Sequence, residues 1–369
     1  MATESAASRA AAAQQPTQAA QPLRVLVTGA SEGIGAAVAR RFAQAPTAGG
    51  GDGASSGGAG VRLALLSRSR EKLEALVAAL PPAGPGGVAE GAGAEGEGKV
   101  GGEGGGGGGG GGGGEGGGGW HVVLPADLRD TAALAGVVAQ AAEQLGGLDV
   151  VVHNGAPGDV DIRDILNLDI WRAQMELHVL SAVAIAGAAQ PALAASPRGG
   201  VLLCVSSICG QMPIPGFAAY CAAKAAQDML VRTLAVAWGG SGIRVLSVAP
   251  GPIHTPGLER YAEHMGRKTA AGASDRAAAV AEGLKLLGAR QPLGRVGTAD
   301  EVAAAIHFLA TQGSFVTGTV LPVDGGALAD YSSWTGSSSA GGSSSQKPGS
   351  SSGRGVEAPA GAAEVGMKV

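Results

Sequence analysis

Cysteine is scarce in this sequence, and its spacing excludes two common uses of the residue. Only Cys204, Cys209 and Cys221 occur among 369 residues, and they form neither a CxxC pair nor a zinc-ligand pattern. A sparse, odd number of cysteines is typical of a reducing compartment. We therefore expect a cytoplasmic protein without a metal site. The Ala- and Gln-rich stretch 1–21 leaves an organelle transit peptide open as the alternative to a disordered extension.

Positive charge and long apolar runs are also limited. The formal net charge is −4, and no basic block stands out. Because nucleic-acid binding requires a cationic surface, we expect no nucleic-acid partner. The apolar stretch 179–195 is shorter than the roughly 20 residues of a membrane span and contains Gln190 and Pro191, so it favours a buried helix over a membrane segment.

Glycine, in contrast, is abundant, and much of it lies in segments that cannot form a core. The chain has 67 glycines, and residues 104–114 are uninterrupted glycine, which is typical of a flexible coil. We interpret about 46–60 and 81–119 as disordered, functionally quiet insertions. Residues 1–22 and 329–369 are expected to be a disordered head and a Ser/Gly-rich tail. A single domain, residues 23–328, remains.

Short apolar runs alternate with helical periodicity along this domain. We expect helices at 34–45, 69–80, 131–145, 168–195, 218–238 and 299–310. We expect strands at 23–28, 61–66, 121–124, 148–152, 201–206, 243–248 and 319–323. Continuous apolar strands are typical of a parallel sheet covered on both faces. The pattern predicts an α/β fold with a doubly wound, Rossmann-like parallel sheet whose ligand site lies at the carboxyl ends of the strands.

A glycine-rich turn joins the first predicted strand to the first helix. Residues 28–35 read TGASEGIG. Glycines allow a tight turn and close approach to a pyrophosphate, and the helix start offers free N–H groups and a positive dipole end. In this strand–turn–helix context the motif predicts a dinucleotide-binding site.

The TGxxxGxG spacing resembles the short-chain dehydrogenase/reductase family, and further motifs follow in the family's order. Asp127-Leu128, Asn154-Gly155-Ala156, the YxxxK motif, Pro-Gly-x-x-x-Thr at 250–255 and the ending at 323–326 match, although His153 replaces an Asn and the Ala-Gly order is reversed. The resemblance spans about 23–327 without the insertions. It implies an oxidoreductase that moves a hydride between nicotinamide and a carbonyl or alcohol.

The resemblance also implies which residues contact the cofactor. They are Gly29, Ser31, Gly33, Ile34, Gly35, Ser67, Arg68, Asp127, Leu128, Asn154, Gly155, Ala156, Tyr220, Lys224, Pro250, Gly251, Ile253 and Thr255. A carboxylate after the second strand would bind the ribose of NAD, whereas an arginine accommodates the 2′-phosphate of NADP. Ser67 and Arg68 stand there, which favours NADP(H). NAD(H) stays the alternative, because Glu32 occupies a turn position where some NADP enzymes carry a basic residue.

Tyr220 and Lys224 form the predicted catalytic pair. They are four residues apart at the start of a predicted helix, so they share one face. A nearby ammonium favours the phenolate, and we expect it to draw the tyrosine pKa from about 10 toward neutrality. Such an acid can protonate the alkoxide that forms when a carbonyl accepts a hydride. The resemblance implies this role and also places Lys224 on the nicotinamide ribose.

Two further residues complete the predicted site. The resemblance implies that Ser207, at the end of the fifth predicted strand, orients the substrate, and Ser206 is the alternative if the register shifts by one residue. The family's remaining catalytic residue is an Asn, and His178 stands at its position. Because histidine donates and accepts hydrogen bonds, His178 either maintains a proton path or is structural.

Two functions are consistent with this sequence. The first is a ketone or aldehyde reductase, similar to 3-oxoacyl reductases and reversible as an alcohol dehydrogenase. The second is a low-turnover NAD(P)-binding regulatory or scaffold protein of the same fold, suggested by His178 and the altered segment at 154–156. The segment 257–291, which we expect to be less regular, selects the small-molecule substrate in the family but does not identify it here. The resemblance implies a homodimer or homotetramer formed through the two long helices, and we expect no membrane partner.

Overall fold

The computed structural model describes residues 21–44, 60–81, 121–155, 165–269 and 275–330. The predicted head, both insertions and the tail lie almost entirely outside these residues. A seven-stranded parallel sheet has the order β3-β2-β1-β4-β5-β6-β9. Its strands are β1 (Leu23–Thr28), β2 (Val61–Ser67), β3 (Val122–Pro125), β4 (Val150–His153), β5 (Val201–Val205), β6 (Arg244–Pro250) and β9 (Val320–Val323). The predicted parallel sheet is confirmed, and its order reverses between β1 and β4, where doubly wound sheets bind ligands.

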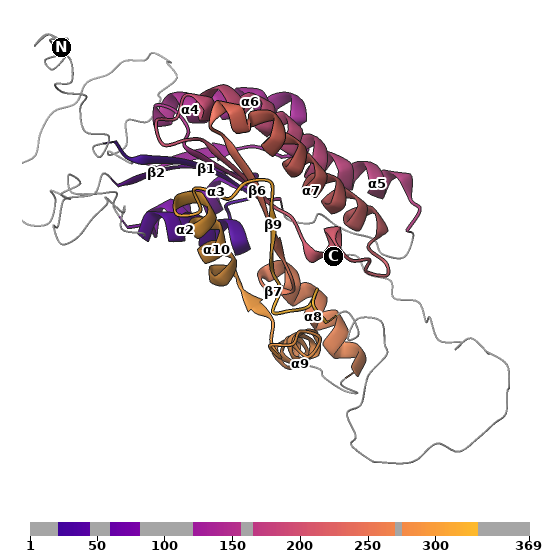
Figure 1. The fold of residues 1–369 in the computed structure, drawn as a ribbon. Coiled ribbons are helices and arrows are strands. Elements are labelled where there is room, and N and C mark those ends of the chain that lie inside the picture. The colour runs from indigo at the N-terminus through magenta and orange to yellow at the C-terminus, as the bar shows by residue number, and fades with distance from the viewer. Residues whose placement is uncertain (1–20, 45–59, 82–120, 156–164, 270–274, 331–369) are drawn as a thin grey trace, which may run out of the picture.

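Helices cover both faces of the sheet (Figure 1). The core of one face is formed with α2 (Gly33–Gln44), α3 (Arg70–Ala78) and α10 (Ala299–Thr311). The core of the other face is formed with α4 (Thr131–Leu145), α6 (Ser181–Ala194) and α7 (Ala218–Trp238). Apolar side chains on both faces of each central strand are therefore buried, which explains the continuous apolar runs in the sequence.

Local side-chain caps start several of these helices. Ser69, as the sequence predicts, accepts a hydrogen bond from Lys72 N at the start of α3. Asp130 accepts one from Ala133 N at the start of α4. Such caps satisfy amide groups that have no partner within the helix, so the helices begin where these polar residues precede an apolar periodic run.

The long helix predicted at 168–195 is not one regular helix. It consists of α5 (Leu168–Met175), a π-helical turn η2 (Glu176–Leu180) and α6. A π turn widens the helix and is often found at functional sites. The whole run Leu168–Ala194 is long and apolar enough to cross a membrane by length and composition. Ile185, Ala189 and Leu193, however, are fully buried in the core between α6 and the sheet.

The segment 257–291 is more regular than the sequence indicates. It contains α8 (Pro256–Thr269) and α9 (Arg276–Gly288), which pack against each other. Gly266 lies against Ala279 and Gly283 against Ala262, so closely that a Cβ atom at either glycine would collide with the facing backbone. Because this interface is made of glycine and alanine, it has little apolar periodicity to detect.

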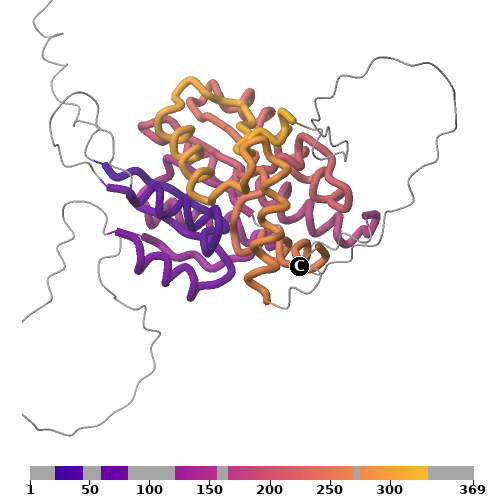
Figure 2. The backbone as a smooth tube through the Cα atoms, turned by 90° about the horizontal axis from the view of Figure 1, so that it is seen from below, coloured from indigo at the N-terminus to yellow at the C-terminus, as the bar shows by residue number. Residues whose placement is uncertain are grey.

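The two helices extend from the lower part of the molecule in Figure 1 and lie nearest the viewer in Figure 2, which is seen from below. In the chain they lie between the two strands of a small parallel pair, β7 (Ile253–His254) and β8 (Gly297–Thr298). This arrangement places them next to the carboxyl end of β6, where the sequence places a ligand site.

Candidate active site

The glycine-rich turn after β1 has a shape that requires glycine. Gly29 and Gly33 have φ values of 59° and 57°, a region that other residues rarely adopt. A Cβ atom at Gly29 would collide with the backbone oxygen of Asn154, and one at Gly35 would collide with the oxygen of Gly29. The turn therefore packs directly on the residue that follows β4, and α2 begins immediately behind it.

Asn154 holds this turn in place by hydrogen bonds at the position between β1 and β4, where the strand order of the sheet reverses. Its backbone N–H donates to Thr28 Oγ1 (2.9 Å), and the Thr28 hydroxyl donates to Asn154 O (3.1 Å). The side-chain amide of Asn154 donates to Gly29 O (3.1 Å). The predicted cofactor contact thus shapes the phosphate-binding turn. Gly155 follows within reach of His178, and Ala156 lies outside the described residues.

The residues after β2 and β3 fit the adenosine half of a dinucleotide. Ser67 is buried, and its hydroxyl has no hydrogen-bond partner among the described residues, whereas Arg68 is exposed. Hydrogen bonds from Arg129 lower the pKa of Asp127, and the charge of Arg68 lowers it further. A buried hydroxyl without a partner, next to a glycine-rich turn, is a group that a bound dinucleotide would satisfy.

The acidic residue of the turn is paired with a cation. Lys72 Nζ, on α3, lies 2.8 Å from Glu32 Oε2, and both side chains are largely exposed. The negative charge of Glu32 is therefore offset by a lysine in the first turn of α3, the helix that follows Ser67 and Arg68.

Ser207 and Tyr220 come together at the carboxyl end of β5. Ser207 caps the short 3₁₀ turn η3 (Ile208–Gly210), where its Oγ accepts from Cys209 N (3.1 Å). Its hydroxyl faces the phenol of Tyr220, and this interaction acts to lower the tyrosine pKa. Ser206, the alternative, faces Asp228 instead, so the strand register brings Ser207 to the tyrosine.

The environment of Tyr220 keeps its phenol protonated. Burial raises the pKa of Tyr220 well above its ordinary value, and the hydrogen bond with Ser207 only partly opposes this. Lys224 Nζ lies 5.7 Å from the centroid of the tyrosine ring. The expectation that this ammonium draws the tyrosine pKa toward neutrality is therefore wrong for this geometry, because the loss of solvent outweighs the neighbouring charge.

Lys224 is only 1% exposed, although it carries an ammonium group. Its Nζ donates to Val205 O (2.8 Å) and to Gln227 Oε1 (3.1 Å). Burial lowers the pKa of Lys224 to about 8. The sequence interpretation missed Gln227, for which the only available signal was an amide on the apolar face of a helix.

His178 lies in the π turn η2 and packs against Tyr220, with ring centroids 5.3 Å apart in an edge-to-face arrangement. Its side chain is fully buried, and neither ring nitrogen has a hydrogen-bond partner among the described residues. Burial, followed by the charge of Lys224, holds the pKa of His178 well below its usual range. His178 is therefore a neutral ring beside the tyrosine, and its backbone oxygen accepts from Gln227 Nε2 (3.1 Å).

The segment after β6 closes the site from the other side. Gly251 N donates to Val323 O (3.0 Å), and its Cα packs on Asp324, leaving no room for a side chain. Ile253 pairs with Gly297 in the small sheet. The methyl group of Thr255 lies beside Gly33 of the phosphate-binding turn. Thr255 thus lies against the glycine-rich turn from the opposite side of the site.

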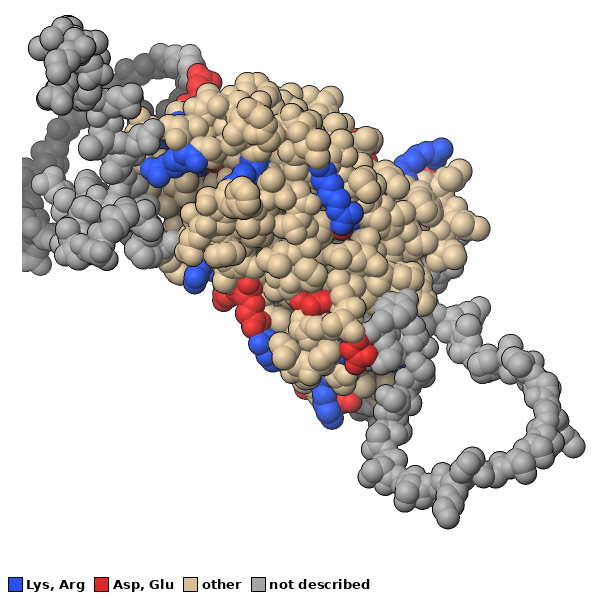
Figure 3. Space-filling view, in the orientation of Figure 1, with Lys and Arg blue, Asp and Glu red and all other residues tan. Residues whose placement is uncertain are grey.

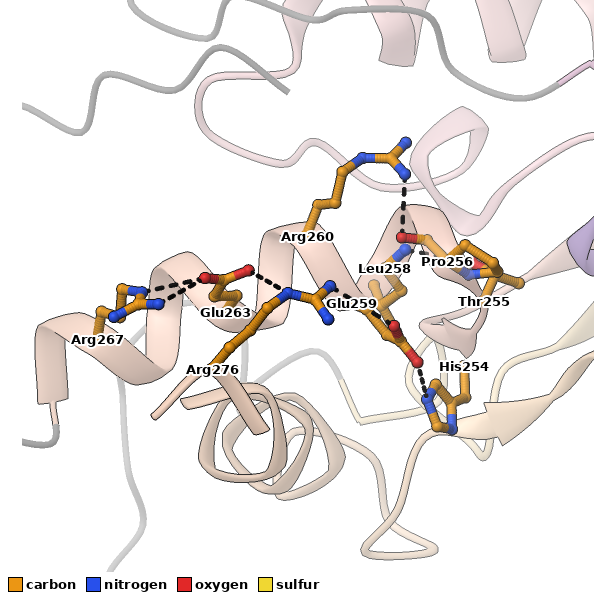
Figure 4. A network of polar contacts seen from close by, with 9 residues as sticks. All are labelled: His254, Thr255, Pro256, Leu258, Glu259, Arg260, Glu263, Arg267 and Arg276. Carbon is orange, nitrogen blue, oxygen red and sulfur yellow. Dashed lines mark hydrogen bonds and ion pairs between the residues drawn. The ribbon is translucent and has the colours of Figure 1, made fainter. Parts of the chain in front are cut away.

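Ion pairs fix α8 and α9 behind Thr255 (Figure 4). His254 contacts Glu259 at 3.0 Å, and Arg276 of α9 contacts Glu263 of α8 at the same distance. These groups are substantially exposed, so each pair contributes little by itself. Within the described residues no group of three His, Cys, Asp or Glu side chains could hold a metal ion.

Comparison with known proteins agrees with this geometry. The family model described as enoyl-(acyl carrier protein) reductase matches residues 115–327. A protein of Xanthobacter autotrophicus named inactive 2-(S)-hydroxypropyl-CoM dehydrogenase 2 is 35% identical, over 55% of this chain and 84% of its own. A 3beta-hydroxysteroid dehydrogenase 1 of Eggerthella lenta is 29% identical, over 82% of this chain and 92% of its own.

Solved structures show the same fold. L-Sorbose reductase of Gluconobacter frateurii, complexed with NADPH and L-sorbose, has a TM-score of 0.63 at 22% identity, covering 85% of this chain and 100% of its own. A short-chain dehydrogenase/reductase family oxidoreductase of Burkholderia thailandensis has a TM-score of 0.60 at 27% identity, covering 84% of this chain and 94% of its own. The fold and site thus define a dinucleotide-dependent oxidoreductase. The chain belongs to the short-chain dehydrogenase/reductase family.

Proposed function

We propose that this protein is an NADP(H)-dependent oxidoreductase that transfers a hydride between nicotinamide and a ketone or aldehyde, reversibly as an alcohol dehydrogenase. The observation that carries the proposal is the convergence of Ser207, Tyr220 and Lys224 at one end of β5. This triad lies at the sheet edge that also carries the glycine turn, where a parallel doubly wound sheet binds ligands.

Each residue has a distinct part in this chemistry. The nicotinamide cofactor, when bound, supplies or accepts the hydride. The hydroxyls of Ser207 and Tyr220 hydrogen-bond the carbonyl oxygen of the substrate, and Tyr220 gives that oxygen its proton. The Lys224 ammonium stabilises the negative charge that the phenol acquires on losing the proton. Because the pKa of Tyr220 is raised by burial, the phenol is in the proton-donating form that carbonyl reduction needs.

Three features support a preference for NADP(H) over NAD(H). Ser67 places no carboxylate after β2, Arg68 is exposed beside it, and the Glu32 carboxylate is already paired with Lys72. A phosphate on the adenosine ribose would complete a charge-assisted hydrogen bond with Arg68.

The cofactor preference is tested by binding. Fluorescence titration should give a Kd for NADPH about tenfold or more below that for NADH, the order expected for one charge-assisted contact. Arg68→Ala should remove this difference by weakening NADPH alone. Arg70→Ala, which removes a nearby exposed arginine paired with Glu74, is the matched control and should leave both affinities unchanged. Equal affinity for the two cofactors in the parent protein would refute the preference.

A low-turnover binding protein is the second candidate, and one observation favours it. His178 stands at the family's Asn position with both ring nitrogens unpartnered among the described residues. NADPH oxidation measured against a panel of ketones and aldehydes separates the two candidates. Cofactor binding without turnover on the panel would favour the second. Full activity in Tyr220→Phe would contradict the proposed mechanism even if turnover were found.

We infer a small-molecule substrate and a homodimer or homotetramer for this protein. Exposed apolar side chains on η2, α6 and α7 support self-association, namely those of Leu180, Val183, Met229 and Val236. All three cysteines are free, which supports a reducing, cytoplasmic setting.

A further inference from the structure

A buried chain of polar groups leads from Lys224 into the interior. Gln227 lies one turn further along α7 and is 0% exposed. Its Oε1 accepts from Lys224 Nζ (3.1 Å), and its Nε2 lies 3.1 Å from His153 Nδ1 and 3.1 Å from His178 O. His153 Nε2 in turn lies 2.9 Å from Ser181 Oγ. The chain thus joins α7, β4, η2 and α6.

The donors and acceptors in this chain can be assigned in only one way. The single Ser181 hydroxyl hydrogen goes to Leu177 O (2.6 Å), so Ser181 Oγ accepts from His153 Nε2. A neutral imidazole has one N–H group, which makes His153 Nδ1 an acceptor for the amide of Gln227. The second amide hydrogen goes to His178 O. The side-chain oxygen of Gln227 is therefore held toward Lys224. If the amide were flipped, this oxygen would face the backbone oxygen of His178, and neither atom could donate a hydrogen bond.

Such a cluster is costly unless every group in it is satisfied. A buried polar group without a partner destabilises the fold, and apolar side chains of the same volume would avoid the risk. Here both ends of the Gln227 amide and both nitrogens of His153 are bonded. The π turn is part of the arrangement, because a backbone oxygen within it, that of His178, accepts a side-chain hydrogen bond from α7.

We propose that Gln227 is a positioning residue that acts through Lys224: its amide, oriented by His153 and by the backbone oxygen of His178, holds the ammonium at the end of β5. Two of the three ammonium N–H bonds are committed to Val205 O and Gln227 Oε1, which leaves one for the reacting side of the site. A neutral amide does not pass a proton from one end to the other. The chain is therefore an anchor for Lys224 and not a proton path.

Gln227 also contributes to the protonation of Lys224. The titratable groups that face this ammonium come from five elements: Tyr220 and Asp228 (α7), His153 (β4), His178 (η2), Cys204 (β5) and Cys209 (η3). The amide oxygen of Gln227 accepts from the charged form, so its removal favours the neutral amine. A carboxylate at the same place would favour the ammonium.

The hydrogen-bond chain itself is tested without cofactor or substrate. Long-range ¹H–¹⁵N correlation spectra of the full-length protein should show one histidine, absent in His153→Phe, as a neutral Nε2–H tautomer that does not titrate between about pH 5 and 8. In Gln227→Met its Nδ1 resonance should move, because that nitrogen loses its donor. A His153 with the Nδ1–H tautomer, or one that titrates in this range, would overturn the assignment. This readout stands whether or not the proposed function is correct.

The consequence for Lys224 rests on the proposed function and is tested by the pH dependence of carbonyl reduction. In Gln227→Met we expect kcat to fall about tenfold and the high-pH limb to move about one pH unit lower, the order expected for one lost hydrogen bond. In Gln227→Glu the same limb should move higher. Gln174→Met is the matched control, since Gln174 is a buried amide on α5 whose Oε1 has no partner among the described residues, and it should leave the profile unchanged.

The decisive result is that the high-pH limb moves in opposite directions in Gln227→Met and Gln227→Glu, because damage to packing would not shift it in opposite directions. Shifts of the same sign, or none, would overturn the positioning role. Absence of turnover in the parent protein would instead count against the proposed function. In that case the pH dependence of NADPH affinity would be measured by fluorescence in the same three variants. Because the remaining N–H group of the Lys224 ammonium is placed to contact the cofactor, the two Gln227 variants should shift this pH dependence in opposite directions.

Discussion

Burial shifts the pKa values of Tyr220 and Lys224 in opposite directions. The pKa of the phenol is raised, and that of the ammonium is lowered to about 8, because loss of solvent disfavours the charged form of each group. At neutral pH the site therefore holds a protonated phenol beside a largely charged lysine. This combination suits a proton donor whose conjugate base is stabilised by a cation.

Carbonyl reduction should consequently lose rate as the pH rises through about 8. Because the pKa of Lys224 is lowered to about 8, its ammonium is present below this pH and is lost above it. The stabilisation of the phenolate by the ammonium is lost at the same pH. The profile of kcat, followed by NADPH oxidation, should be flat on the acidic side and fall above this point. Lys224→Met should be slower by about 10²-fold or more at neutral pH. A rate that rises through pH 8 would contradict this view.

Cys221 is the residue next to Tyr220 and should be the most reactive thiol among the three. A hydrogen bond from Cys209 lowers the pKa of Cys221 to about 7, whereas burial raises the pKa of Cys204 to about 12. Since the thiolate is the nucleophile, iodoacetamide should modify Cys221 first, with a midpoint near pH 7 by mass spectrometry. The adduct should block the site, and Cys221→Ala should resist inactivation. Earlier modification of Cys204 would contradict the assignment.

At the scale of elements, the two helices α8 and α9 depend on glycine at their interface. Gly283→Ala would place a Cβ atom against the backbone oxygen of Ala262. We expect it to destabilise the protein by roughly 1–3 kcal/mol, as overpacking does, and to raise KM for a substrate that contacts this pair.

Gly136 offers the matched comparison for this prediction. It lies within α4, and a Cβ atom there meets nothing within 4 Å. Gly136→Ala should therefore be neutral or stabilise by up to about 1 kcal/mol, because alanine loses less entropy in a helix. Chemical denaturation of both variants measures the difference, and equal effects would show that the tight packing of α8 on α9 is not as described.

The π turn is an element that apolar periodicity does not reveal. The run 168–195 has the composition of one buried helix, and the widening is seen only in the backbone, where Ser181 N–H donates to Glu176 O five residues earlier. The Gln227 side chain that donates to His178 O in this turn comes from 49 positions away, beyond the range of any local pattern.

At the scale of the molecule, α6 and α7 lie on one side of the sheet and leave apolar side chains exposed. The surface over them carries few charged residues on the face shown in Figure 3. Val236 is 86% exposed and Met229 56% exposed. A patch of this kind is typical of a protein–protein interface, and a two-fold pairing of these helices would cover it.

Val236→Glu should therefore convert the protein to a smaller species. A buried, unpaired carboxylate disfavours the paired state strongly, and light scattering after size-exclusion chromatography measures the mass. Phe315→Glu, which changes an exposed residue in the loop after α10, is the control and should leave the mass unchanged. An unaltered mass in Val236→Glu would contradict association through α7.

Strands, most helices and the Tyr220–Lys224 motif could be recognised from the amino-acid order alone. Apolar runs, a glycine turn and the spacing of Tyr220 and Lys224 are local features, and the parallel sheet that they predict is the one observed. The partners of those residues could not be recognised in this way. His153 and Gln227 are 74 positions apart, and His153 and Ser181 are 28 apart, so their contact depends on how β4, α6 and α7 pack. The pKa values follow the same packing, because Lys224 loses contact with solvent, and Tyr220 loses part of it, only after these elements have come together.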